Sequence, residues 1–172
     1  MNFKDYIASV TNFPVEGVLF RDITPLLENG PAFNEAVNEL AAYAKSRGAE
    51  IIVGPESRGF MFGCSMANKL NIGFVPVRKP GKLPRETVSY KYDLEYGSNE
   101  IHIHKDAIKP GQKVVICDDL LATGGTVEAA IKLIESLGGE VVGICFVIEI
   151  DEGLGGRKKL EGYDVYSLIQ YD

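Results

Sequence analysis

The chain has 172 residues, of which 45% are hydrophobic, and its formal net charge is −6 at pH 7. This length supplies one hydrophobic core but not two full-sized domains, so we expect a single domain over residues 1–172. The acidic balance argues against a protein that neutralises many phosphates of a nucleic acid, although a local group of amides and arginines can still bind one small anion.

The cysteines and the first residues indicate a cytoplasmic location. Cys64, Cys117 and Cys145 are far apart and lie in or beside apolar stretches, which is typical of reduced core residues. Residues 1–6 contain an acid and have no apolar region after their single lysine, unlike a secretory signal. Since no apolar run approaches the length of a membrane span, we expect no membrane partner.

The first part of the chain predicts two helices separated by an irregular stretch. Apolar residues between positions 3 and 10 recur at i, i+3, i+4 and i+7, which favours a short amphipathic helix. Prolines and glycines then interrupt residues 12–31. The helical period returns over residues 33–44, where Pro31 fits the start of the helix and Gly48 its end.

The middle of the chain predicts a β-α-β unit followed by a long loop. Residues 50–53 read as a buried strand, a turn and a helix lead to Leu70, and residues 74–78 read as the next strand. Residues 79–100 contain two prolines, two glycines and many charges, so we expect a long mobile loop there. Residues 101–104 alternate as a strand does.

The last part continues the alternation of strands and helices. Residues 113–117 predict a strand, residues 126–137 a helix, and residues 141–148 and 164–169 two further strands. This order implies an α/β fold with a mainly parallel twisted sheet and helices on both faces. Ligands of such sheets bind outside the carboxyl ends of the strands.

One such end carries the strongest functional signal of the sequence, Cys-Asp-Asp-Leu-Leu-Ala-Thr-Gly-Gly-Thr at residues 117–126. Glycines at a helix start let backbone amides approach a phosphate, and threonine hydroxyls add donors. The carboxylates of Asp118 and Asp119 suit ribose hydroxyls or the water shell of a magnesium ion. A bare Thr-Gly-Gly-Thr is more often only a tight turn with a threonine N-cap, but the complete segment after an apolar strand favours a phosphorylated ribose.

The sequence gives less support for a site of the kinase or dehydrogenase type and for a metal site. The sequence contains neither of the glycine-rich motifs that precede a nucleotide-binding helix in kinases and dehydrogenases. His102 and His104 share one face of a predicted strand, but no third ligand is evident, so we assign them no metal.

Residues 117–126 resemble the phosphoribosyl-pyrophosphate motif of the purine phosphoribosyltransferases. In the hypoxanthine-guanine branch the position of Ala122 is an aspartate that assists proton transfer, which alanine cannot do. Four further segments are similar to the adenine phosphoribosyltransferase family: PVEGVLFRDITP at 14–25, GPESRGF at 54–60, RKPGKLP at 78–84 and SYKYDLEYG at 89–97. Together they cover nearly the whole chain.

The resemblance implies a phosphoribosyltransferase-like fold with a small N-terminal hood, a mobile catalytic loop and a cis peptide between Glu56 and Ser57. It also implies a role for each matching residue. The 5-phosphate would be bound by Ala122, Thr123, Gly124, Gly125 and Thr126, which we call the phosphate cradle, and the ribose by Asp118 and Asp119. Pyrophosphate would be bound by Glu56, Ser57, Arg58, Arg78, Lys79, Lys82 and Tyr96, and adenine by Leu19, Phe20, Arg21 and Ile150. Glu95 would be the catalytic residue that transfers the proton.

The implied reaction converts adenine and 5-phosphoribosyl 1-pyrophosphate to AMP and pyrophosphate. Mg²⁺ is expected to be held through the substrate and water, with no direct protein ligand, and the family suggests a homodimer. Two alternatives stay open. One is a phosphoribosyltransferase for another base, such as xanthine or orotate. The other is a non-catalytic sensor of phosphoribosyl pyrophosphate, for which the acidic chain offers no nucleic-acid-binding extension.

Overall fold

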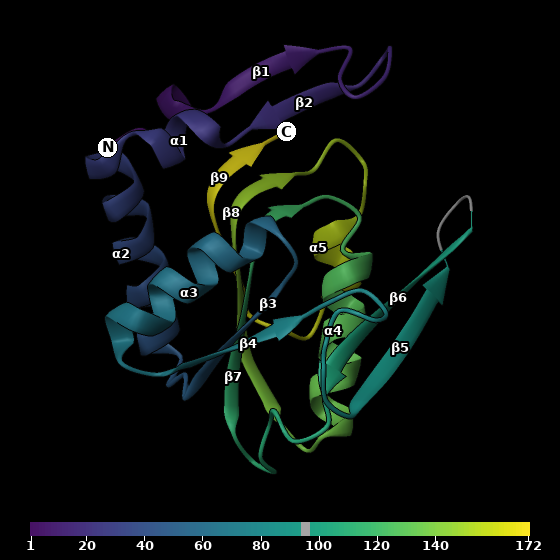
Figure 1. Cartoon of the computed structure of the whole chain (residues 1–172). Coiled ribbons are helices and arrows are strands. Elements are labelled where there is room, and N and C mark those ends of the chain that lie inside the picture. The colour runs from purple at the N-terminus through teal and green to yellow at the C-terminus, as the bar shows by residue number, and fades with distance from the viewer. Residues whose placement is uncertain (94–96) are drawn as a thin grey trace.

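The computed structural model describes residues 1–93 and 97–172 and is built around a five-stranded sheet (Figure 1). All four pairings in it are parallel, in the order β4-β3-β7-β8-β9. The strands are β3 (Ile51–Pro55), β4 (Gly73–Val77), β7 (Lys113–Leu121), β8 (Glu140–Ile150) and β9 (Val165–Tyr171). The expected mainly parallel sheet is therefore confirmed.

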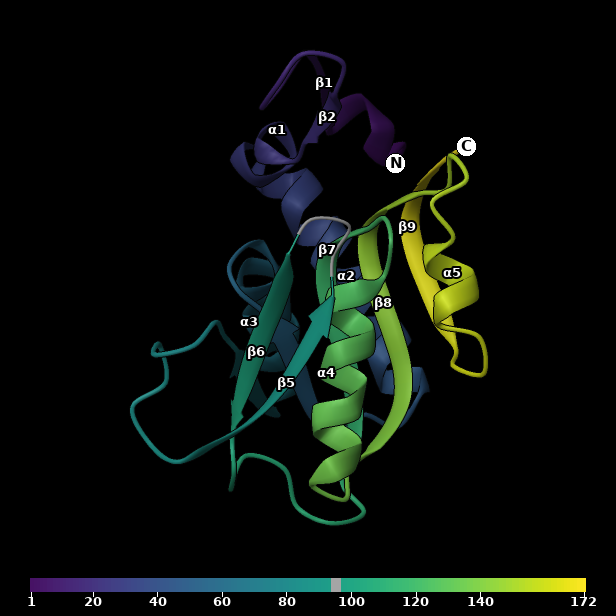
Figure 2. The ribbon, with the colours of Figure 1, turned by 90° about the vertical axis from the view of Figure 1, so that its right-hand side faces the viewer.

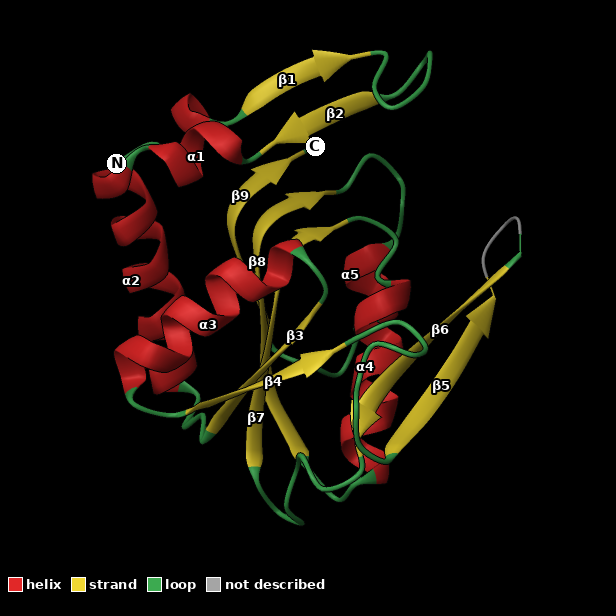
Figure 3. Ribbon diagram, viewed as in Figure 1, coloured by secondary structure: helices red, strands yellow, loops and turns green. Residues whose placement is uncertain are grey.

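Helices cover both faces of this sheet, as Figure 3 shows. α2 (Gly30–Ser46) and α3 (Arg58–Leu70) lie on one face, and α4 (Gly125–Ser136) lies on the other. Successive residues of β7 belong to the two apolar clusters in turn, so Val115 packs with α2 and α3, whereas Val114 packs with α4. Because these strands are buried on both faces, they read as continuous apolar runs in the sequence.

The N-terminal segment forms a separate hairpin over the carboxyl edge of the sheet (Figures 1 and 2). The hood, residues 3–28, contains a 3-10 helix η1 (Phe3–Tyr6), strands β1 (Ala8–Thr11) and β2 (Leu19–Asp22), and helix α1 (Thr24–Glu28). The expected helix over residues 3–10 is wrong beyond Tyr6, because the backbone is already extended at Ile7. The irregular stretch expected for residues 12–31 is likewise wrong where β2 and α1 form.

A second hairpin packs on α4, beside the sheet rather than in it (Figure 2). Its strands are β5 (Thr87–Asp93) and β6 (Ser98–His104), paired antiparallel, and one bridge between Arg78 and His102 joins it to the end of β4. The long loop expected for residues 79–100 is therefore wrong for β5 and the start of β6. A short helix, α5 (Gly156–Lys159), was not expected either. Within residues 1–93 and 97–172, no helix combines the length and apolar character needed to cross a membrane.

Candidate functional site

Two turns that follow neighbouring strands form the candidate site. β3 ends at Pro55 and leads through a cis Glu56–Ser57 peptide into α3, while β7 ends at Leu121 and leads through the phosphate cradle into α4. Since β3 pairs with β7, both turns lie at the same edge of the sheet. A cleft of about 380 Å³ opens between them, lined by Glu56, Ser57, Arg58, Lys79, Asp118, Asp119, Leu120 and Thr126.

The phosphate cradle has the backbone geometry of an anion site. Gly124 has a φ of +82°, in the left-handed region that favours glycine, and α4 begins at the next residue. The cradle surrounds a cavity of about 150 Å³ that is also lined by Asp118, Leu120, Leu121 and Val127. The first amides of a helix have no partner within it, so they and the Thr126 hydroxyl can donate to phosphate oxygens.

The two aspartates of β7 have different environments. Asp119 accepts a hydrogen bond at 2.6 Å from Nε of Arg58, and its side chain is 10% exposed. Asp118 accepts the Asp119 amide at 2.8 Å. Burial raises the pKa of Asp118 well above its ordinary value, and the neighbouring Asp119 carboxylate raises it further. Both carboxyl groups line the cleft, where they can form hydrogen bonds with ribose hydroxyls.

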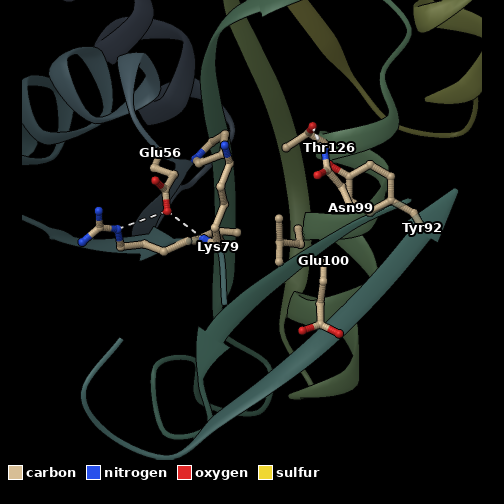
Figure 4. A pocket seen from close by; sticks show the side chains of 10 residues that line it. Glu56, Lys79, Tyr92, Asn99, Glu100 and Thr126 are labelled. Carbon is tan, nitrogen blue, oxygen red and sulfur yellow. Dashed lines mark hydrogen bonds and ion pairs between the residues drawn. The ribbon is translucent and has the colours of Figure 1, made fainter. Parts of the chain in front are cut away.

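The Glu56 carboxylate lines the cleft and also holds Arg78 and Lys79, the basic residues that follow β4. Its Oε1 accepts hydrogen bonds from Nε of Arg78 at 3.3 Å and from the Lys79 amide at 2.7 Å (Figure 4). Although burial raises the pKa of Glu56, the Lys79 amide and the Arg78 charge outweigh it and hold the pKa below its ordinary value. The structure thus brings Arg58, Arg78 and Lys79 to one edge, whereas the exposed Lys82 lies outside the described lining of the cleft.

Tyr92 belongs to the same site, although the sequence did not single it out. Its hydroxyl lies 2.9 Å from Oγ1 of Thr126, and with Asn99 and Glu100 it lines a small cavity of about 80 Å³ beside the phosphate cradle (Figure 4). Val88 and Tyr92 both pack against the apolar cluster of α4, and their even spacing on a strand is a signal that could have placed Tyr92 on the inner face.

The hood is attached to the same edge through its second strand. Leu19, Phe20 and Arg21 lie on β2, and the Phe20 ring is 5.8 Å from the Arg58 guanidinium. The Arg21 guanidinium stacks 3.8 Å from the centre of the Tyr171 ring, and Tyr171 pairs with Ile150 at the end of β8. The candidate base-binding residues are thereby brought to the carboxyl edge. Glu95 and Tyr96 lie outside the described residues.

An ion pair between the buried Glu149 and the exposed Arg157 lies next to the phosphate cradle. The Glu149 side chain on β8 is 10% exposed and accepts two hydrogen bonds from Arg157, at 2.8 and 2.6 Å, and one from Ser167 at 2.7 Å. Arg157 belongs to α5, whose first residue, Gly156, packs against the carbonyl of Ala122. No sequence pattern pointed to this pair.

The Glu149 pair gives an expected dependence of stability on pH. Hydrogen bonding from Arg157 lowers the pKa of Glu149 below its ordinary value of 4.5, so the stabilisation is complete above that pH and is lost as the pH falls through the lower, folded-state pKa. Glu149→Gln is expected to cost about 1–3 kcal/mol of unfolding free energy at pH 7. Urea unfolding at several pH values measures the difference from the wild type, which should shrink below pH 4.5. A difference that does not change with pH would contradict this account.

Comparisons with known proteins agree with this geometry. The family model described as phosphoribosyl transferase domain matches residues 26–170. A protein of Lactobacillus gasseri named adenine phosphoribosyltransferase is 62% identical over 171 residues, which are 99% of this chain and 97% of that protein. The protein of the same name from Lactobacillus acidophilus is 59% identical over the same shares of the two chains.

Solved structures that are also named adenine phosphoribosyltransferase have the same fold as this chain. The adenine phosphoribosyltransferase of Thermoanaerobacter pseudethanolicus is 54% identical with a TM-score of 0.94, and the match covers 98% of both chains. The enzyme of Saccharomyces cerevisiae, complexed with an imino-altritol bisphosphate and adenine, is 41% identical with a TM-score of 0.91 over 96% of both chains.

Proposed function

Because the chain belongs to the adenine phosphoribosyltransferase family, we infer that it transfers the 5-phosphoribosyl group of phosphoribosyl pyrophosphate to adenine, giving AMP and pyrophosphate. This reaction makes it a pentosyltransferase of purine salvage. The observation that carries the inference lies at the carboxyl edge, where the cleft lined by Arg58, Asp118 and Asp119 adjoins the cavity of the phosphate cradle. The two spaces share Asp118, Leu120 and Thr126 as lining residues.

The phosphoribosyl group is held from two sides. The amides and hydroxyls of the phosphate cradle (Ala122, Thr123, Gly124, Gly125 and Thr126) bind the 5-phosphate. Asp118 and Asp119 form hydrogen bonds with the ribose hydroxyls. The two aspartates lie at the carboxyl end of strand β7 and the cradle follows it directly, so the two sets of groups keep a fixed separation. This fixed geometry holds the anomeric carbon in place for reaction.

The departing pyrophosphate is stabilised by the basic groups of two neighbouring strand ends. Arg58, Arg78 and Lys79 supply positive charge, and the turn that starts at Glu56 supplies backbone donors from Ser57 onward. The Glu56 amide itself already donates to the Val77 carbonyl at 2.9 Å. Lys82 and Tyr96 are proposed to join them on the strength of the resemblance alone. Charge that develops on the leaving group is met by preorganised donors, which lowers the barrier.

Adenine is proposed to enter beneath the hood. Phe20 and Ile150 sandwich the ring, while the backbone of Leu19 and Arg21 reads its edge. A peptide carbonyl and amide complement the N6 donor and N1 acceptor of adenine. The attack comes from N9 on the face opposite the departing pyrophosphate, and Glu95 transfers the N7 or N9 proton.

Mg²⁺ is proposed as the metal, bound mainly through the substrate. The described residues contain no group of three or more carboxylate, histidine or cysteine side chains that could hold an ion by themselves. Asp119 is already bonded to Arg58, so Asp118 and Asp119 fit the outer, water-mediated shell of the ion. When bound, the ion adds positive charge at the pyrophosphate.

The assembly and location of the enzyme are further proposals. We propose a homodimer, as the resemblance implies, and a cytoplasmic location, which the free and buried Cys117 and Cys145 support. Cys64, also expected in the core, is instead exposed. Neither nucleic acid nor a membrane is a proposed partner.

A panel of bases tests the function. The protein is incubated with magnesium, phosphoribosyl pyrophosphate and adenine, hypoxanthine, xanthine or orotate, and the nucleotide product is separated and quantified. We expect AMP as the main product. Preferred use of another base would overturn the specificity, and no product from any base would favour a sensor.

A further inference from the structure

The side chain of Tyr92 closes one side of the phosphate cradle. Its hydroxyl lies 2.9 Å from Oγ1 of Thr126, and its ring packs on Gly125, where an added β-carbon would lie 3.5 Å from the ring edge. Figure 4 shows the tyrosine and the threonine facing each other from β5 and α4. Tyr92 therefore contacts two of the five residues of the cradle.

The hydrogen bond between the two hydroxyls can run in either direction. A threonine hydroxyl has one hydrogen to donate and two lone pairs that accept. If Thr126 donates to Tyr92, its hydrogen is used and cannot reach a phosphate oxygen. If Tyr92 donates to Thr126, the threonine hydroxyl can donate its own hydrogen to the phosphate. The two consecutive hydrogen bonds, from tyrosine to threonine and from threonine to phosphate, then strengthen each other.

We propose that Tyr92 is a positioning residue for the 5-phosphate, because its hydroxyl donates to Oγ1 of Thr126 and directs the threonine hydrogen toward the bound phosphate. The proposal rests on the proposed role of the phosphate cradle. It adds a group that acts on the phosphate through Thr126, from a hairpin outside the main sheet. Since coupling is reciprocal, a bound phosphate also fixes the orientation of the Tyr92 hydroxyl.

Tyr92→Phe removes the hydroxyl and keeps the ring that packs on Gly125. We expect the dissociation constant for ribose 5-phosphate, measured by calorimetry, and the KM for phosphoribosyl pyrophosphate to rise about 3- to 10-fold, because one hydrogen bond is lost. The KM for adenine should stay unchanged. Tyr90→Phe is the matched control, since Tyr90 lies on the same strand but is 38% exposed, and it should leave all these constants unchanged.

A second pair of variants tests the route through Thr126. Thr126→Val should weaken ribose 5-phosphate binding by itself, and adding Tyr92→Phe to it should cause no further loss, because the two hydroxyls act as one chain. Thr126→Ser keeps the hydroxyl and should restore most of the affinity. Additive losses in the double variant, or wild-type affinity in Tyr92→Phe, would overturn the proposal and leave the proposed function intact. Wild-type protein that fails to bind ribose 5-phosphate would overturn the proposed role of the phosphate cradle and, with it, the role of Tyr92, whereas the panel of bases tests the reaction separately.

Discussion

Glu95→Ala is expected to lower kcat by roughly 10²- to 10⁴-fold and to leave the affinity for phosphoribosyl pyrophosphate nearly unchanged. The resemblance places the proton-transferring glutamate at this position, between the end of β5 and the start of β6. A residue that transfers the proton of adenine does not contact the phosphate groups. Its loss should therefore reduce turnover rather than binding of the phosphoribosyl donor. Steady-state kinetics with both substrates varied separates the two effects.

The control for Glu95→Ala is a second acid of the same hairpin region. Glu86 is exposed and pairs with Lys105 at 3.4 Å, away from the cleft, so Glu86→Ala should retain wild-type turnover. Glu95→Gln should be as slow as the alanine variant, because glutamine keeps the shape but cannot exchange the proton. Turnover near that of the wild type in either Glu95 variant would remove this residue from the mechanism.

Gly156→Ala is expected to destabilise the protein by about 2 kcal/mol or more and to raise the KM for phosphoribosyl pyrophosphate at least about 10-fold. A β-carbon at this position would lie 2.2 Å from the carbonyl oxygen of Ala122 and 2.9 Å from Cδ1 of Leu121. The first of these atoms belongs to the backbone of the phosphate cradle, so the clash is relieved only if the cradle or α5 moves. Thermal unfolding and substrate kinetics measure the two consequences.

The matched control is Gly30→Ala at the start of α2. A β-carbon there would meet nothing within 4 Å, so this variant should keep both stability and KM. If Gly156→Ala were as stable and as active as Gly30→Ala, α5 would not support the cradle. Loss of stability with an unchanged KM would confine α5 to a role in folding.

The elements of the main sheet could be predicted because their sequence pattern reflects burial. Strands β3, β7 and β8 are apolar on both faces, and α2 shows one apolar face. β5 escaped prediction because it is largely exposed and pairs with β6 alone. β1 escaped for a similar reason, since three of its four residues are exposed.

The site could be predicted where a turn follows a buried strand, and not where distant segments meet. Asp118 and Asp119 lie at the carboxyl end of β7 and the phosphate cradle comes directly after it, so strand order alone placed them at the ligand edge. The contact between Tyr92 and Thr126 joins positions 34 residues apart. It depends on how the second hairpin packs on α4, which no local pattern encodes.

The two arginines at the carboxyl edge, Arg58 in the cleft and Arg78 in the small cavity beside it, already have anionic partners within the chain. Arg58 holds Asp119 at 2.6 Å, and Arg78 holds Glu56 at 3.3 Å. An incoming anion must therefore compete with a carboxylate for each guanidinium, because neither guanidinium is an unpaired positive charge. Chloride or another small monovalent ion gains little from such an exchange, whereas a diphosphate brings enough oxygen atoms and charge to displace or share both partners. We therefore expect the internal carboxylates to discriminate among anions and to favour a pyrophosphate group over the simple salts that surround the protein.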